Sequence, residues 1–103
     1  MVETLLRSLL QEFKAKARIT WDDNDSDLED IILEADNYLT TLTNASFDYE
    51  KERWVKTLLL ERCRYDYHNA LEEFERNFVD ELKRLTLEVA IGRVGVLNEQ
   101  AST

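Results

Sequence analysis

The chain has 103 residues, of which 44% are hydrophobic and 34% charged, so we expect one compact domain over residues 1–103 and no two-domain enzyme. Its 22 acidic residues outnumber 13 basic ones and give a net charge of −9, which argues against a surface for nucleic acid or for an anionic membrane. Apolar runs such as Leu58 to Leu60 are far below the ~20 residues that a membrane-spanning helix needs, which favours a soluble protein.

Two features favour a location in the cytosol. No basic region precedes the apolar residues near the N-terminus, so they do not resemble a secretory signal. The single cysteine, Cys63, cannot form an internal disulfide, which fits a reducing compartment and excludes a multi-cysteine metal site.

The first two predicted helices are amphipathic. Apolar residues at steps of three and four predict a helix over residues 3–18. An acidic loop follows, and Ser26 with Glu29 three residues later has the pattern of a capping box, so a second helix is predicted from there to about residue 42.

A long third helix and a shorter fourth one are predicted in the rest of the chain. Asp48 or Ser46 can cap the third helix, which we expect to reach about residue 75. Asn77 can cap the fourth helix, whose two separate apolar sets are Phe78, Leu82, Leu85 and Val89, and Val79, Leu87, Ala90 and Ile91. Beyond this helix we expect a flexible tail over residues 92–103.

The predicted class is all-α. Proline is absent and both glycines lie close to the C-terminus, so the turn residues that a sheet-rich domain needs are missing. The expected architecture is a small antiparallel helical bundle of three long helices plus a shorter C-terminal one. Its predicted core contains Leu9, Phe13, Ile31, Ile32, Ala35, Trp54, Leu58 and Leu59.

The residues that catalysis would require do not form a recognisable pattern. His68, the only histidine, lies about 140° from Cys63 around the predicted helix, so a nucleophilic pair is not expected. The acidic residues from Asp23 onward partly match a calcium loop, but Leu28 stands where that loop needs glycine. We therefore expect no enzyme, no metal and no cofactor.

Charge is divided unevenly along the chain. Residues 1–50 contain 12 acidic and 4 basic residues, whereas residues 51–103 contain 10 and 9, so the halves carry −8 and −1. Such asymmetry, together with apolar residues left over on the fourth helix and the tail, suits a protein that works by contact with other proteins.

Several segments resemble one family. Residues 18–25 (RITWDDND) and 27–35 (DLEDIILEA) are similar to the opening of the head-tail connector proteins of long-tailed phages, also called adaptor or head-completion proteins. Residues 64–74 (RYDYHNALEEF), 77–78 and 85–90 (LTLEVA) are similar to the second half of that family. Many members have Gly or Pro after the second helix, whereas this chain has Thr43-Asn44-Ala45-Ser46.

The resemblance implies a structural virion protein without enzymatic activity. Such a protein binds the portal protein from beneath, associates with itself into a ring, and offers a platform to the stopper or next tail component. It occupies the head-tail interface of the virion, and the host cytoplasm before assembly. No specific nucleic-acid binding is expected of it.

The partner-binding residues are predicted at the C-terminal end. Ile91, Val94, Val96 and Leu97 are interleaved with two glycines and are too few to form a core of their own, so we expect them to grip the portal or a neighbouring subunit. The alternative function is an acidic cytosolic helical regulator or inhibitor that binds a basic protein partner.

Overall fold

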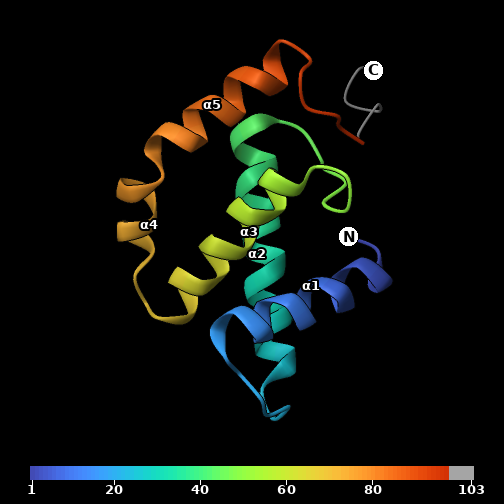
Figure 1. The fold of residues 1–103 in the computed structure, drawn as a ribbon, viewed down its shortest axis with the longest axis vertical. Helices are drawn as coiled ribbons and strands as arrows, with labels where there is room; N and C mark the ends of the chain where they lie inside the picture. Colours follow the sequence, from blue (N-terminus) through green and yellow to red (C-terminus); the bar gives the residue numbers. More distant parts are fainter. Residues whose placement is uncertain (98–103) are drawn as a thin grey trace.

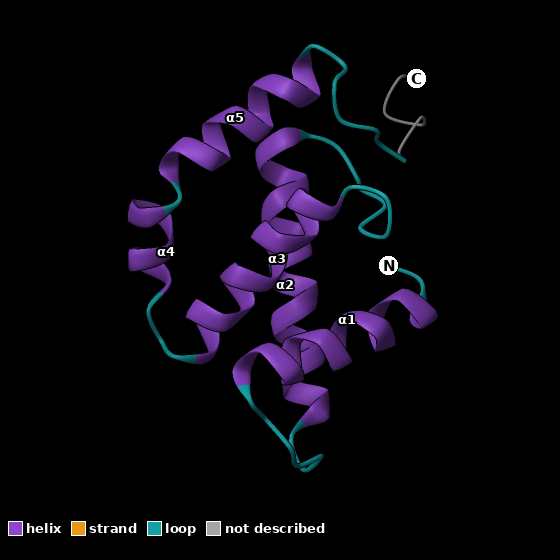
Figure 2. Ribbon diagram, in the orientation of Figure 1, coloured by secondary structure: helices purple, strands orange, loops and turns teal. Residues whose placement is uncertain are grey.

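The computed structural model describes residues 1–97, and over these residues it contains helices and no strand. The helices are α1 (Glu3–Ala17), α2 (Asp25–Thr43), α3 (Arg53–Tyr67), α4 (Leu71–Asn77) and α5 (Val79–Ala90). In Figure 1, α2 rises through the centre and α3 returns beside it, while α1 lies across them and α4 and α5 follow one another along the far side. Figure 2 shows the short loops between them, and the all-α class is confirmed.

Four helices are followed by a residue with left-handed backbone, and after α5 this residue is Gly92. The other three are not glycine: they are Arg18, Asn44 and Asn69, with φ of 60°, 56° and 57°. In each case the next residue's N–H bonds to the carbonyl five positions earlier, from Ile19 to Lys14, from Ala45 to Thr40 and from Ala70 to Tyr65. These bonds satisfy carbonyls at the helix ends.

The prediction of one long third helix to about residue 75 is wrong, because the chain turns at residues 68–70. Asn69 adopts the left-handed conformation there, and α4 starts afresh at Leu71. The turn brings the Phe74 ring to 5.8 Å from that of Tyr65 and fully buries it. Burial of an aromatic ring therefore compensates the interrupted helix.

Three predicted helix caps are also wrong. Helix α3 begins at Arg53 after Glu52, so neither Asp48 nor Ser46 caps it. Helix α2 begins at Asp25, so Ser26 lies inside it and is exposed, and Asn24 occupies the N-cap position without a side-chain bond. The Asp25 carboxylate instead accepts a hydrogen bond from Lys14. Asn77 is the last residue of α4, and Phe78 stands between α4 and α5.

The core draws residues from all of these helices and from the loop between α2 and α3. Six of the eight predicted core residues are buried, but Ile31 and Trp54 are only partly buried. Trp54 faces outward enough to hold the guanidinium of Arg84 over its ring, 4.7 Å from the centroid. The loop contributes the buried residues Ala45, Phe47 and Tyr49, which periodicity did not predict because the segment is not helical.

The segment after α5 folds back onto the body of the protein as far as residue 97. Val94 is buried, the Leu97 N–H donates to the Ser46 carbonyl at 2.8 Å, and the Gly95 N–H donates to Glu52 at 3.2 Å. Within the predicted tail, residues 92–97 therefore contact the body of the protein through Val94 and these two hydrogen bonds. The remainder of the tail, residues 98–103, lies outside the described residues.

Candidate functional site

An apolar groove runs between α2 and α5. It encloses about 570 Å³, and we call it the α2/α5 groove. It is lined by Tyr38, Leu42, Glu75, Val79, Leu82, Lys83, Thr86, Leu87 and Ala90. Three of the four residues of the second apolar set predicted on the fourth helix thus share one wall. Val79 and Leu87 are 43% and 58% exposed and line the same groove, so the groove presents adjoining apolar side chains to solvent.

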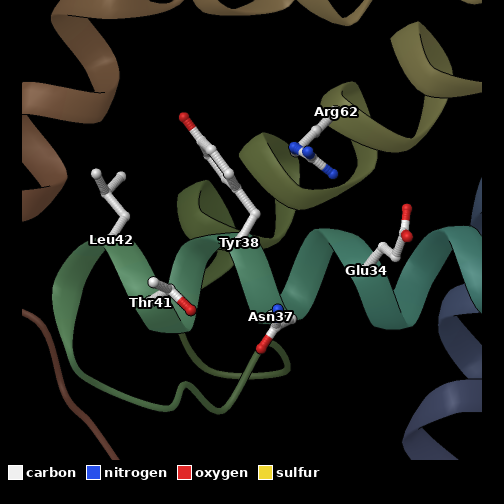
Figure 3. Close-up of a pocket in the computed structure, with 6 residues that line it drawn as sticks. All are labelled: Glu34, Asn37, Tyr38, Thr41, Leu42 and Arg62. Carbon is white, nitrogen blue, oxygen red and sulfur yellow. The ribbon is translucent and has the colours of Figure 1, made fainter.

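A second hollow adjoins the groove and shares Tyr38 and Leu42 with it. Figure 3 shows Tyr38 standing between Leu42 and Arg62, with Asn37, Thr41 and Glu34 along α2. The Arg62 guanidinium lies over the Tyr38 ring, 4.4 Å from its centroid. Tyr38 therefore lies between the apolar α2/α5 groove and a hollow lined by Arg62 and Glu34.

The Arg62 guanidinium is incompletely satisfied. Its Nε and Nη1 atoms are buried and have no hydrogen-bond partner within residues 1–97. Buried donors usually have a partner, because leaving one unpaired costs about 1–3 kcal/mol. Burial and the Glu75 carboxylate raise the pKa of the Tyr38 hydroxyl, while Arg62 acts against that rise. This region of the molecule can accept an additional hydrogen-bond acceptor.

The four predicted partner-binding residues do not form one surface. Val94 is buried and faces the core, so it is not available to a partner in this conformation. Ile91, Val96 and Leu97 are exposed, but Leu97 lines a different hollow, next to Val2 and Leu5 of the N-terminal region. A role for these three residues in binding stays a prediction.

The acidic loop before α2 is organised by a lysine. Lys14 Nζ lies 2.6 Å from Asp22 and 2.7 Å from Asp25, and its side chain is almost completely buried. The hydrogen bonds that the Lys14 ammonium donates to Asp22 and Asp25 raise its pKa. Asp25, one of the carboxylates of the partial calcium-loop match, is therefore engaged with an internal cation.

The residues examined for catalysis lie apart. Cys63 is buried in the core, and burial raises the pKa of its thiol to about 12, whereas a nucleophilic cysteine needs a lowered pKa. His68 is exposed at the end of α3. Within residues 1–97, no three side chains of His, Cys, Asp or Glu come together as a metal site, and no helix could cross a membrane.

The sequence pattern around Arg62 and Tyr38 does not mark either residue as part of a site. Their contact joins α3 to α2, and no local spacing rule predicts it. The Lys14 pairs were missed because a lysine in an amphipathic helix is normally placed on the solvated face.

Comparison with known proteins reveals no relative. The sequence matches no protein-family model, and neither a curated protein nor a solved structure shows significant similarity to it.

Proposed function

We propose that this protein is a structural head-tail connector of a long-tailed phage. In this proposal it binds beneath the portal protein, associates into a ring there, and offers a platform to the stopper or next tail component. It acts by contact alone and needs neither a catalytic group nor a cofactor. It resides in the virion at the head-tail interface, and in the host cytoplasm before assembly.

The observation that carries the proposal is the exposed apolar wall of α5. Residues 85–90, one of the segments that resemble the connector family, contribute Leu87 and Ala90 to the α2/α5 groove. A domain of this size gains nothing from leaving Leu42, Val79 and Leu87 in water, whereas an assembly protein buries such residues against its partners.

The charge distribution supports the same proposal. Acidic residues dominate the first half of the chain, which forms α1, the acidic loop and α2. Carboxylates repel DNA phosphates, so an acidic ring would let DNA slide past without holding it. The proposal therefore includes portal and tail proteins as partners, but no nucleic acid and no membrane.

A binding experiment with the portal protein from the same genome tests the proposal. Purified portal rings should retain the full chain in a pull-down and show an added ring of density by electron microscopy. Portal rings from an unrelated phage are the matched control and should retain none. Failure of the cognate rings to bind at micromolar concentration would overturn the proposed function.

The alternative function is an acidic regulator or inhibitor of a basic protein. It is favoured by the exposed carboxylates at the start of α2, including Asp23, Asp27 and Asp30. A regulator of this kind would bind its partner more weakly as salt is raised, because exposed charges are screened. Salt-insensitive capture by portal rings would favour the connector, since an apolar interface is not screened.

A further inference from the structure

An exposed tryptophan lies in the acidic loop between α1 and α2. Trp21 is 48% exposed, and it begins the sequence Trp21-Asp22-Asp23. Asp22 is engaged by Lys14, whereas Asp23 is exposed and forms no ion pair within residues 1–97. This segment, residues 20–24, is called the Trp21 loop below. It presents one large apolar side chain beside one uncompensated negative charge.

The α2/α5 groove has features that complement the apolar side chain and the negative charge of the Trp21 loop. Its walls are apolar, and Lys83 on the α5 side forms no ion pair with any described residue. Arg62, in the adjoining hollow, has two buried N–H donors without acceptors. Glu34 and Glu75 also line this region, so it is close to neutral in a chain whose net charge is −9.

The loop and the groove lie at opposite ends of α2, so they cannot meet within one chain. Helix α2 starts at Asp25, directly after the loop, and Leu42 in the groove is near its other end. A rise of 1.5 Å per residue separates these positions by ~25 Å along the helix. Any contact between the two features is therefore a contact between molecules.

We propose that a second copy of this chain inserts its Trp21 loop into the α2/α5 groove. Trp21 fills the apolar groove between Leu42 and Leu87. Asp23 then faces Lys83, the exposed cation of the groove. This contact deepens the proposed function, because it rests on the ring association stated there and assigns its interface.

Electrostatics favours this head-to-tail contact over a symmetric one. A two-fold contact through the first half of the chain would bring two surfaces of charge −8 together. Head-to-tail contact instead sets the acidic loop of one copy against a nearly neutral region of the next, in which Lys83 has no ion pair among the described residues. Because the contact is heterologous, each pair of copies keeps one loop and one groove free, and the chain of copies closes into a ring or continues as a filament.

The single contact should be weak. One tryptophan buries roughly 150–250 Å², well below the ~800 Å² per partner of a stable interface. Closing a ring adds a contact without a further loss of translational freedom, so the assembly is more stable than one pair. Association of the free protein should therefore require high concentration.

Two exposed-site variants test the contact directly. Trp21→Ala removes the inserted side chain, and Leu87→Glu places a charge in the groove; both positions are exposed, so the fold should be retained. In sedimentation experiments from micromolar to millimolar concentration, the wild type should self-associate and each variant should stay monomeric. Leu33→Glu, an exposed leucine on α2 outside the groove, is the matched control and should behave as the wild type.

Mixing the two variants gives the decisive result. Leu87→Glu still has its loop and Trp21→Ala still has its groove, so the mixture should form a one-to-one dimer that cannot grow further. A monomeric wild type at millimolar concentration, unchanged association of Trp21→Ala, or a mixture that stays monomeric would each overturn the inference.

An exchange of the charges at positions 23 and 83 tests the proposed contact between Asp23 of one copy and Lys83 of the next. Asp23→Lys and Lys83→Glu should each weaken association, and the double variant should recover it because every interface regains an opposite pair. No recovery would contradict the placement of Asp23. These outcomes are independent of the portal pull-down, so a chain that binds portal but does not use this contact refutes the inference and leaves the proposed function standing.

Discussion

The Tyr49 hydroxyl donates a 2.6 Å hydrogen bond to Oδ1 of Asp36, and this bond ties the loop between α2 and α3 to the middle of α2. Tyr49 is almost completely buried, and burial together with the Asp36 carboxylate raises the pKa of its hydroxyl. The loop has little regular structure, so it depends on such contacts for its position.

Tyr49→Phe should lower the free energy of unfolding by about 1.5–3 kcal/mol, the range for a hydrogen bond to a charged group. Urea unfolding at neutral pH measures this loss. Tyr67→Phe is the control, because the structure shows no hydrogen bond for the Tyr67 hydroxyl within residues 1–97. Equal effects of the two substitutions would contradict the role given to the Asp36 bond.

Cys63 should make the protein sensitive to alkali. Burial raises the pKa of its thiol from 9.0 to about 12, so the folded chain retains a proton that the unfolded chain loses. The stabilisation is complete below pH 9 and falls by about 1.4 kcal/mol per pH unit above it, until the folded pKa is reached. In Cys63→Ala, urea unfolding at a series of pH values should show a clearly smaller slope just above pH 9. An unchanged slope would show that other groups cause the loss.

Leu58 is the test of the predicted core. It is a buried residue of α3, and Leu58→Ala should lower the free energy of unfolding by about 2–5 kcal/mol. Leu33→Ala, at a 39% exposed position, should change it by less than about 0.5 kcal/mol. Chemical denaturation of both variants provides the comparison. A negligible effect of Leu58→Ala would show that the side chain of Leu58 is not packed in the core.

Val94 should stabilise the fold although it lies beyond the last helix. Its side chain is buried, so Val94→Ala should cost about 1–3 kcal/mol in unfolding free energy. A chain ending after Ala90 should lose at least as much, whereas the exposed-site variant Val96→Ala should melt as the wild type does. Unchanged stability of the truncated chain would place the segment outside the cooperative fold.

The acidic loop should not bind calcium. Asp22 and Asp25 are paired with Lys14, and Leu28 occupies the position at which a calcium loop needs glycine. Titration calorimetry with calcium at micromolar concentration should show no saturable heat. Lys14→Met, which frees both carboxylates, provides a sensitive comparison, and saturable binding by the wild type would contradict the prediction.

Local pattern predicted the parts of the candidate site that lie within single helices. The second apolar set on the last helix was visible as periodicity, and it forms most of the α5 wall of the groove. Arg62, in contrast, resembles an ordinary charged residue in sequence. Only the packing of α3 against α2 places it over Tyr38 and buries two of its donors.

The sequence by itself determined the all-α class, the inward faces of α1 and α2, and the acidic character of the first half, because helix periodicity, missing proline and charge are short-range or additive properties. Tertiary structure decided the turn at Asn69, the burial of Val94 and the capture of Asp22 and Asp25 by Lys14. Each of these depends on contacts between segments that are not neighbours in a helix, where burial of Phe74 or pairing of a buried ammonium outweighs the local preference.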